Sequence, residues 1–334
     1  MPMHLVPMRA PEFWQRGGWP ALALAPAGWL YGLAGRLRAW RARPADPGVP
    51  VICVGNLTAG GTGKTPVAIE IARHLAGRGH RPAFLTRGHG GRQTGPLRVD
   101  PDRHGSAEVG DEPLLLARVA PTFVARDRPL GARAAVEAGA DVLVMDDGLQ
   151  NPALAKHLRI VVVDGATGFG NGRVIPAGPL RVPLAQGLAE ADLFVVMGED
   201  RHGLRAMLAR QARVVAARLE PDAADAAGFA GRRVVAFAGI GRPEKFFATL
   251  ERCGAHVVAR TAFPDHHRFS AAELAGLRET AEAAEATLAT TAKDAVRLPP
   301  AMRAAVAVLP VRAVFAPGAG LFEAVEEAVD VRHR

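Results

Sequence analysis

Short apolar runs alternate with helical patterns along most of this chain, from about residue 47 onward. This alternation is typical of an α/β protein in which helices cover both faces of a mostly parallel sheet. Helical patterns lie between several of the predicted strands, for example at residues 65–76 and 112–119. The apolar runs that we interpret as the first strands are residues 49–57, 82–86, 122–125, 141–145, 159–163 and 193–197.

A second series of alternating elements begins at residue 232, after a stretch at 199–231 that is rich in Ala, Asp and Arg. That stretch has little periodicity and is a possible linker. The second series comprises predicted strands at 234–238, 256–259, 286–289 and 305–311 and predicted helices at 243–253, 271–284 and 321–329. We therefore expect a larger α/β domain at residues 46–230 and a smaller one at 231–334, with a substrate cleft between them.

The first 45 residues have a different pattern, which predicts contact with a membrane. Residues 17–35, GGWPALALAPAGWLYGLAG, carry no charged side chain, but the five glycines and two prolines in this run weaken it as a helix. Its aromatic residues favour the membrane–water interface, and the arginines at 36, 38, 41 and 43 suit anionic lipid headgroups. We interpret residues 1–45 as a membrane-associating helical segment; a true span and a helix packed on the protein's own core are the alternatives.

Composition narrows the class of protein without fixing its function. The 334 residues are 49% apolar and 22% charged, as in a folded globular protein. Cys53 and Cys253 are the only cysteines, which argues against a disulfide framework or a zinc site built from cysteines. The net charge of +8 favours an anionic membrane or a phosphorylated substrate as partner. We expect no nucleic-acid partner, because no basic run is interleaved with aromatic residues and aromatic content is 5%.

A glycine-rich loop follows the first predicted strand and precedes a predicted helix, in the run VICVGNLTAGGTGKT at residues 51–65. That order builds a phosphate cradle, because glycines let backbone N–H groups turn toward an anion and the helix N-terminus adds its positive end. In such a loop Lys64 reaches the outer phosphates and the Thr65 hydroxyl holds Mg²⁺. The loop departs from the usual motif at its first position, where Thr58 replaces glycine. The predicted nucleotide-binding residues are Thr58, Ala59, Gly60, Gly61, Thr62, Gly63, Lys64 and Thr65.

Three further segments carry residues suited to chemistry. Asp146 and Asp147 end the apolar run DVLVMDDG, where carboxylates in a P-loop sheet support Mg²⁺; the alternative is a pair that caps a turn. Asp111 opens a helix in the segment GDEP, either as a catalytic residue or as an ordinary helix cap. The segment FPDHHRF places His266 and His267 between a strand and a helix, where a base or an orienting group, or simply a polar loop, is expected.

Eight segments in order resemble one family, the tetraacyldisaccharide 4′-kinases of lipid A biosynthesis in Gram-negative bacteria. They are VGNLTAGGTGKTP, LTRGHGG, GDEPLLLA, VMDDGLQ, VIPAGPLR, FAGIGRPEKFF, FPDHHRFS and TTAKDAVRL. The resemblance implies transfer of the γ-phosphoryl group of ATP to the 4′-hydroxyl of a tetra-acylated glucosamine disaccharide 1-phosphate, which yields lipid IVA. It also implies two α/β/α domains with the site between them, at the cytoplasmic face of the bacterial inner membrane.

Carried over residue by residue, the resemblance implies a catalytic set of Asp111, His266 and Lys64. Asp111 is then the base, helped by His266, while Thr65, Asp146 and Asp147 hold Mg²⁺. His267 stands where the family has another residue and is not expected to be the primary histidine. Two other functions stay open: a membrane-associated P-loop ATPase that acts as a switch or partitioning factor, and a soluble small-metabolite kinase. The partitioning proteins have a lysine before the two glycines, whereas this chain has Ala59.

Overall fold

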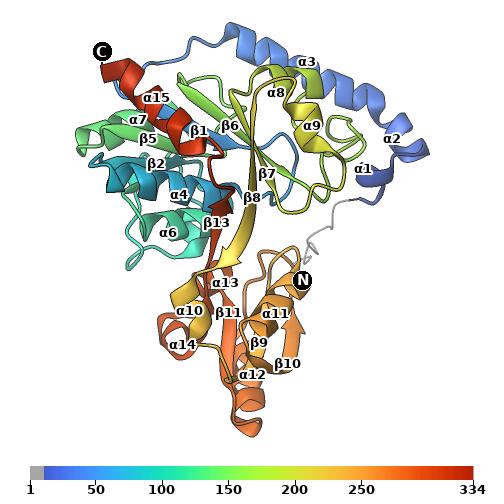
Figure 1. Cartoon of the computed structure of the whole chain (residues 1–334), viewed down its shortest axis with the longest axis vertical. Coiled ribbons are helices and arrows are strands. Elements are labelled where there is room, and N and C mark those ends of the chain that lie inside the picture. The colour runs from blue at the N-terminus through green and yellow to red at the C-terminus, as the bar shows by residue number, and fades with distance from the viewer. Residues whose placement is uncertain (1–10, 334) are drawn as a thin grey trace.

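The computed structural model describes residues 11–333 and has two α/β units. Figure 1 shows the larger unit above the smaller one, with β8 and β13 running between them. The larger sheet has nine strands in the order β13-β8-β7-β6-β1-β5-β2-β4-β3 within this described range. In that order the strands are Val311–Phe315, Arg213–Pro221, Leu193–Met197, Leu158–Asp164, Val51–Gly55, Val142–Asp146, Pro82–Thr86, Thr122–Val124 and Leu97–Arg98.

The strands from β8 to β4 pair in parallel, and β13 and β3 pair antiparallel at the two edges. The central strands β1 and β5 are buried along their whole length, as expected for a sheet covered on both faces. The α/β fold predicted from the sequence is therefore confirmed. Because parallel strands end at the same edge of a sheet, the residues that follow β1, β2 and β5 meet there.

Helices cover both faces of the larger sheet. On one face α4 (Lys64–Gly77) and α15 (Leu321–His333) pack on the strands through apolar residues such as Val67, Ile71 and Val325. On the other face α7 (Arg128–Glu137) packs through Ala132 and Ala135. The remaining helices of this unit are α5 (Ser106–Val109), α6 (Asp111–Ala117), α8 (Leu184–Ala189) and α9 (Leu204–Leu208).

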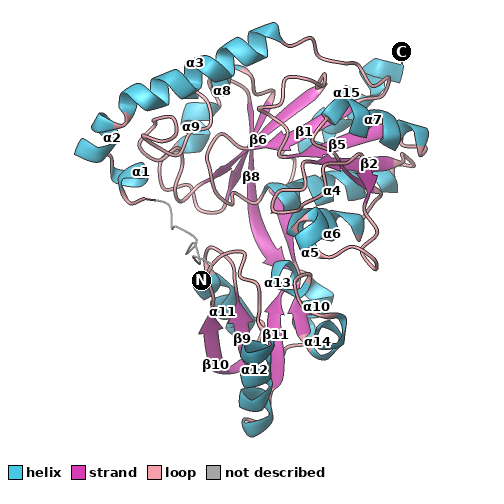
Figure 2. Cartoon of the chain, turned by 180° about the vertical axis from the view of Figure 1, so that it is seen from behind, coloured by secondary structure: helices cyan, strands magenta, loops and turns pink. Residues whose placement is uncertain are grey.

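The smaller unit has a parallel four-stranded sheet in the order β10-β9-β11-β12. Its strands are His256–Ala262, Arg233–Ala238, Thr287–Thr291 and Ala307–Leu309 in that order. Alternate residues of β9 face opposite helices, because α11 (Pro243–Arg252) packs against Val234 and Ala236 while α12 (Ala271–Ala283) packs against Val235 and Phe237. Figure 2 shows this sheet from behind. The other helices here are α10 (Ala223–Ala227), α13 (Ala292–Ala295) and α14 (Pro300–Ala305).

The expected division into domains differs from the structure at the C-terminal end. The region 199–231, described above as a possible linker, contains strand β8 of the larger sheet and lies mostly within the expected domain 46–230. The expected domain 231–334 ends early, because the chain returns to the larger unit after β12. There β13 pairs antiparallel with β8, and α15 buries Leu321, Val325 and Val329 in the core around α4. The two units are thus joined by two chain crossings rather than one.

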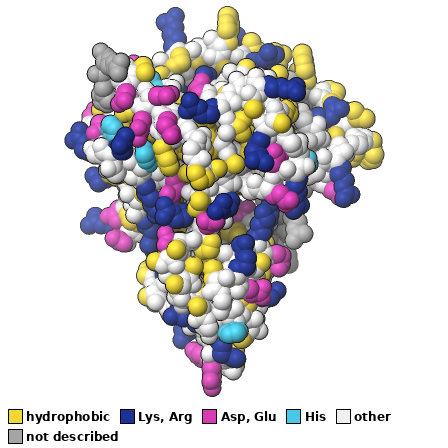
Figure 3. Space-filling view, viewed as in Figure 1, with side chains coloured by type: hydrophobic (Ala, Val, Ile, Leu, Met, Phe, Trp, Pro, Cys, Tyr) yellow, Lys and Arg dark blue, Asp and Glu magenta, His cyan; other side chains and the backbone are white. Residues whose placement is uncertain are grey.

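The N-terminal segment, described from Pro11, forms α1 (Phe13–Arg16), α2 (Trp19–Ala23) and α3 (Ala25–Arg41). Helix α3 contacts the protein through its glycines, since a Cβ at Gly28 would lie 2.7 Å from the Val174 carbonyl oxygen. Its large apolar side chains face outward, and Trp29 and Trp40 are 67% and 80% exposed. Figure 3 shows apolar side chains along the edge of the molecule where α2 and α3 lie. No helix within residues 11–333 is both long enough and apolar enough to cross a bilayer.

Candidate functional site

The loop at residues 58–65 is held open toward solvent at the carboxyl end of β1. Gly60 and Gly63 have φ angles of 118° and 87°, a region that L side chains rarely adopt. Gly63 is also the N-cap of α4, so the loop leads directly into the helix N-terminus. The Asn56 side chain donates to the Gly60 carbonyl at 3.2 Å, and the Ala59 N–H donates to the Pro179 carbonyl at 2.7 Å. These contacts fix the backbone in the form that a phosphate nest requires.

Lys64 and Thr65 begin α4 and face the two acids that follow β5. The Thr65 hydroxyl donates to Asp146 Oδ2 at 2.9 Å, and Lys64 Nζ lies 3.8 Å from Asp147 Oδ1. Asp147 has a φ of 58°, which turns its side chain out of the strand direction. Of the two carboxylates, Asp146 contacts Thr65, whereas Asp147 forms an ion pair with Arg181 at 2.7 Å.

The pKa values of the two neighbouring acids are shifted in opposite directions. Burial raises the pKa of Asp146 to about 6, although Lys64 and the Thr65 hydroxyl act against it. Burial also raises the pKa of Asp147, but the charges of Lys64 and Arg181 outweigh it and hold that pKa below its usual range. Arg181 lies in the Pro- and Gly-rich loop 171–184, at the end of VIPAGPLR, one of the segments that carried the family resemblance; the sequence did not single out this residue.

The residues present fit a nucleotide with its metal ion. Four buried side-chain oxygens have no hydrogen-bond partner within residues 11–333: Gln186 Oε1 of α8, and a set of three made up of Asn56 Oδ1, Thr62 Oγ1 and Asp146 Oδ1. All three belong to the loop, to the residues that lead into it or to the strand end beside it. Unpaired buried oxygens are costly, and such a cluster beside an ammonium group and a helix N-terminus suits Mg²⁺ and phosphate ligands. Thr65 and Asp146 are the residues that would hold the ion.

Asp111 is the first residue of α6 and is reached from the smaller unit. Its Oδ2 accepts hydrogen bonds from His266 Nδ1 and from Arg297 Nε, both at 2.8 Å. Burial raises the pKa of Asp111, but the hydrogen bond from His266 and the charge of Arg297 outweigh it, so the pKa lies below its usual range. The structure thus brings together Asp111 and His266, which the resemblance paired. His267 points elsewhere, toward Glu273 at 3.0 Å.

Helix α6, which begins at Asp111, contacts α4, which begins at the glycine loop. The charge of Glu112, the residue after Asp111, acts on Asp146 beside the loop. Tight backbone packing also fixes the start of α6, since a Cβ at Gly91 would lie 2.5 Å from the Val109 carbonyl carbon and one at Gly110 would lie 2.4 Å from the His89 carbonyl oxygen. A carboxylate with a depressed pKa therefore lies at the unit boundary, on the side of the phosphate cradle.

Sequence reasoning did not single out Arg297 or assign a role to Lys293. Lys293 Nζ lies 3.1 Å from His266 Nε2 and 3.5 Å from Glu112 Oε1. Both residues lie in TTAKDAVRL, one of the segments that carried the family resemblance. The resemblance of that segment was the signal that could have identified Arg297 and Lys293. Its sequence alone does not show which residues of the larger unit they contact.

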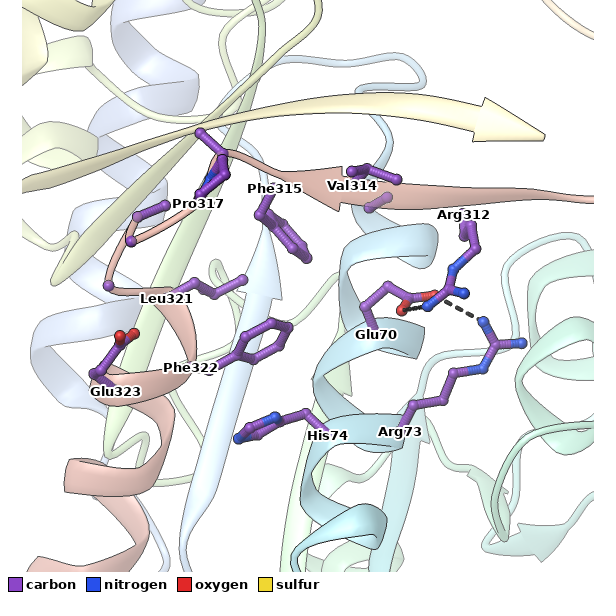
Figure 4. A pocket seen from close by; sticks show the side chains of 15 residues that line it. Glu70, Arg73, His74, Arg312, Val314, Phe315, Pro317, Leu321, Phe322 and Glu323 are labelled. Atoms are coloured by element: carbon purple, nitrogen blue, oxygen red, sulfur yellow. Dashed lines mark hydrogen bonds and ion pairs between the residues drawn. The ribbon is translucent and has the colours of Figure 1, made fainter. Parts of the chain in front are cut away.

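A separate cavity of about 560 Å³ lies beside the C-terminal half of α4. Figure 4 shows Glu70 among its lining residues, with dashed lines to Arg73 and Arg312. Both ion pairs measure 2.7 Å. His74 stacks on Phe322 there, with ring centroids 4.2 Å apart. None of the predicted site residues lines this cavity, so we place the candidate site at the glycine loop and the unit boundary instead.

Comparisons with known proteins agree on one family. A family model described as tetraacyldisaccharide-1-P 4′-kinase matches residues 20–330. Tetraacyldisaccharide 4′-kinase of Paramagnetospirillum magneticum is 58% identical over 91% of this chain and 94% of its own length. That of Rhodospirillum centenum is 56% identical over 91% and 92%. The solved structure of LpxK from Aquifex aeolicus in complex with ATP has the same fold, with a TM-score of 0.74, 24% identity and coverage of 93% of this chain and 100% of its own.

Proposed function

This chain belongs to the tetraacyldisaccharide-1-P 4′-kinase family, and we propose that it transfers the γ-phosphoryl group of ATP to the 4′-hydroxyl of a tetra-acylated glucosamine disaccharide 1-phosphate. The product is lipid IVA, an intermediate of lipid A and hence of lipopolysaccharide. The observation that carries the proposal is the contact between Asp111 and His266, 2.8 Å across the unit boundary and beside the phosphate cradle. A P-loop protein that hydrolyses ATP as a switch has no need of a base positioned for an alcohol.

The glycine loop and its neighbours bind the triphosphate in this proposal. Lys64 neutralises the outer phosphates, and the N–H groups of residues 60–65 face them at the N-terminus of α4. Thr65 and Asp146 would hold Mg²⁺, which would neutralise negative charge on the triphosphate. Asp147 orients Lys64 and Arg181 through its two ion pairs, at 3.8 and 2.7 Å. A direct role of Asp147 at the metal, which the resemblance implies, stays a prediction.

Asp111 acts as the base toward the sugar. Its carboxylate is ionised at neutral pH, because its pKa is held below the usual range. It accepts the proton of the 4′-hydroxyl as the new P–O bond forms, while His266 holds the carboxylate in place. Most of the rate enhancement in phosphoryl transfer comes from such positioning and from neutralised charge.

The N-terminal helices provide the contact with the membrane in this proposal. Trp19 and Trp40, at opposite ends of α2 and α3, are 78% and 80% exposed, and Trp29 and Leu30 between them are 67% and 60% exposed. Aromatic residues beside arginines suit the interface of an anionic bilayer. We propose that this surface docks on the cytoplasmic face of the inner membrane, so that the acyl chains stay in the bilayer while the sugar enters the cleft.

The test uses purified protein, γ-labelled ATP and an acylated glucosamine disaccharide 1-phosphate in detergent. Label in the lipid product supports the kinase; hydrolysis of ATP without labelled lipid contradicts it and supports an ATPase switch. Lys64→Ala removes a charged hydrogen-bond donor, which costs about 1.5–3 kcal/mol, so ATP binding should weaken roughly 10- to 100-fold. Lys245→Ala, at an exposed lysine of the smaller unit, is the matched control and should bind ATP as the natural protein does.

A further inference from the structure

The carboxylate of Asp111 is held from one side. Within residues 11–333, both of its hydrogen bonds end on Oδ2, one from His266 and one from Arg297. Both donors come from the smaller unit, whereas Asp111 belongs to the larger one. This arrangement leaves Oδ1 as the oxygen that accepts the substrate proton, and it makes the orientation of the base depend on the smaller unit.

The Arg297 side chain is held in place by contacts within its own unit. Its side chain is 2% exposed, and its Nη1 donates to the Gly239 carbonyl and to Asp294 Oδ1, both at 2.9 Å. Asp294 is itself fully buried and accepts from the Gly239 N–H at 3.0 Å and from the Thr291 hydroxyl at 2.6 Å. The guanidinium plane is therefore set by the smaller unit, and its Nε edge is directed at Asp111.

The second donor on that edge is unused. Nη2 of Arg297 is buried and has no hydrogen-bond partner among the described residues. Because Nε and Nη2 form one fork, no other described acceptor competes with Asp111 for this edge. A buried guanidinium that leaves a donor unpaired to hold a single carboxylate oxygen is costly, which indicates that the contact serves the site.

Lys293 fixes the histidine in the same way. Its ammonium group has only N–H donors, so the 3.1 Å contact with His266 Nε2 requires a lone pair on that nitrogen. The proton of a neutral imidazole then lies on Nδ1, where it donates to Asp111. Asp265 and Glu112 flank the ammonium group at 3.6 and 3.5 Å.

We propose that Arg297 and Lys293 are positioning residues for phosphoryl transfer: Arg297 orients the Asp111 carboxylate directly, and Lys293 does so by setting the tautomer of His266. This inference rests on the proposed function of Asp111 as the base. The groups that face Asp111 are His266 and Arg297 across the boundary and Glu112 beside it. Burial raises the pKa of Asp111, and of the two cross-boundary groups Arg297 is the permanent cation that opposes this rise.

The experiment measures kcat, the KM for ATP and the pH profile of kcat/KM for Arg297→Gln and Lys293→Gln, between about pH 4 and about pH 8. We expect kcat to fall about 10- to 100-fold in each, because a base displaced by an ångström loses about that much, with the KM for ATP unchanged. In Arg297→Gln the acid limb of the pH profile of kcat/KM should also move to higher pH. The reason is that this variant lacks a cation that lowers the pKa of Asp111.

The matched control is Arg303→Gln. Arg303 holds the same turn by donating to the carbonyls of Ala295, Val296 and Leu298, but it does not contact Asp111. If these variants acted only by loosening the turn, Arg297→Gln and Arg303→Gln would both have a smaller fraction of active protein. The acid limb of the pH profile of kcat/KM would then stay in place in both. A wild-type kcat and an unmoved acid limb in soluble Arg297→Gln would overturn the inference.

Two further variants keep the experiment decisive. If Arg297→Gln does not fold, Arg297→Lys retains the charge without the fork and should still lower kcat; a wild-type kcat in both Arg297→Lys and Lys293→Gln also overturns the inference. Asp111→Asn separates the two levels of argument. An active Asp111→Asn refutes the proposed base, whereas an inactive Asp111→Asn beside fully active arginine and lysine variants refutes the positioning roles alone.

Discussion

A single methyl group at Gly91 should displace Asp111, the proposed base, without touching it. A Cβ at this position would lie 2.5 Å from the Val109 carbonyl carbon, 2.6 Å from the Glu108 oxygen and 2.8 Å from the Gly110 nitrogen. Ordinary contact begins near 3.4 Å, so the backbone at Val109 must move by about 0.9 Å. All three atoms are backbone, and no side chain can swing aside. Asp111 follows two residues later and must move with them.

The loop around Gly91 cannot easily absorb this shift. The Gly91 N–H donates to the Gly88 carbonyl at 3.0 Å, and the Gln93 N–H donates to the Glu108 carbonyl at 2.9 Å. We therefore expect Gly91→Ala to destabilise the fold by about 1–3 kcal/mol and to lower kcat about 100-fold, with ATP affinity nearly unchanged. The measurements are thermal unfolding, ATP binding and the lipid phosphorylation rate at saturating substrate.

Gly79→Ala is the control for lost stability. Gly79 has a φ of 91° and open space around its Cα, so alanine there costs about 1–2 kcal/mol of backbone strain far from Asp111. It should lower the unfolding temperature and leave kcat unchanged. If folded Gly91→Ala retains the natural kcat, the reasoning fails, because either the loop yields or the position of Asp111 does not limit the reaction.

Three other outcomes follow from the site and the N-terminal helices. Asp111→Asn should lower kcat about 100- to 10,000-fold while ATP binding persists, and a normal rate would exclude Asp111 as the base. His266→Gln removes a hydrogen bond that lowers the pKa of Asp111 against the effect of burial. A carboxylate with a depressed pKa loses its charge only as pH falls through that pKa, so the acid limb of the pH profile of kcat/KM should move to higher pH in this variant. An unmoved acid limb would contradict the pairing of Asp111 with His266. Replacing Trp19, Trp29 and Trp40 together with serine should weaken sedimentation with anionic vesicles at least about 10-fold, whereas equal sedimentation would refute docking through α2 and α3.

The local pattern predicted the central elements well. Strands expected at 82–86 and 193–197 match β2 and β7 at both ends, and the glycine loop lies between β1 and α4 as expected. These features depend on residues adjacent in the chain, where apolar runs and glycines act directly on the backbone. The pattern was weaker at the edge of the larger sheet. Strand β8 has only two fully buried residues and lies in the stretch interpreted as a possible linker. The strand predicted at 305–311 covers β12 but ends at Val311, so most of β13 was missed.

The phosphate cradle and its chemistry were determined by the sequence alone, because Thr58–Thr65 lie in one loop whose glycines dictate its shape. The contacts of the proposed base, Asp111, were decided by the tertiary structure. Asp111 is 155 positions from His266 and 186 from Arg297, and no periodicity or spacing relates residues so far apart. They meet because the chain crosses to the smaller unit at β8 and returns at β13, which brings α13 and the loop after β10 against the start of α6. A family resemblance named the histidine, but only the folded chain showed the arginine that holds the same carboxylate.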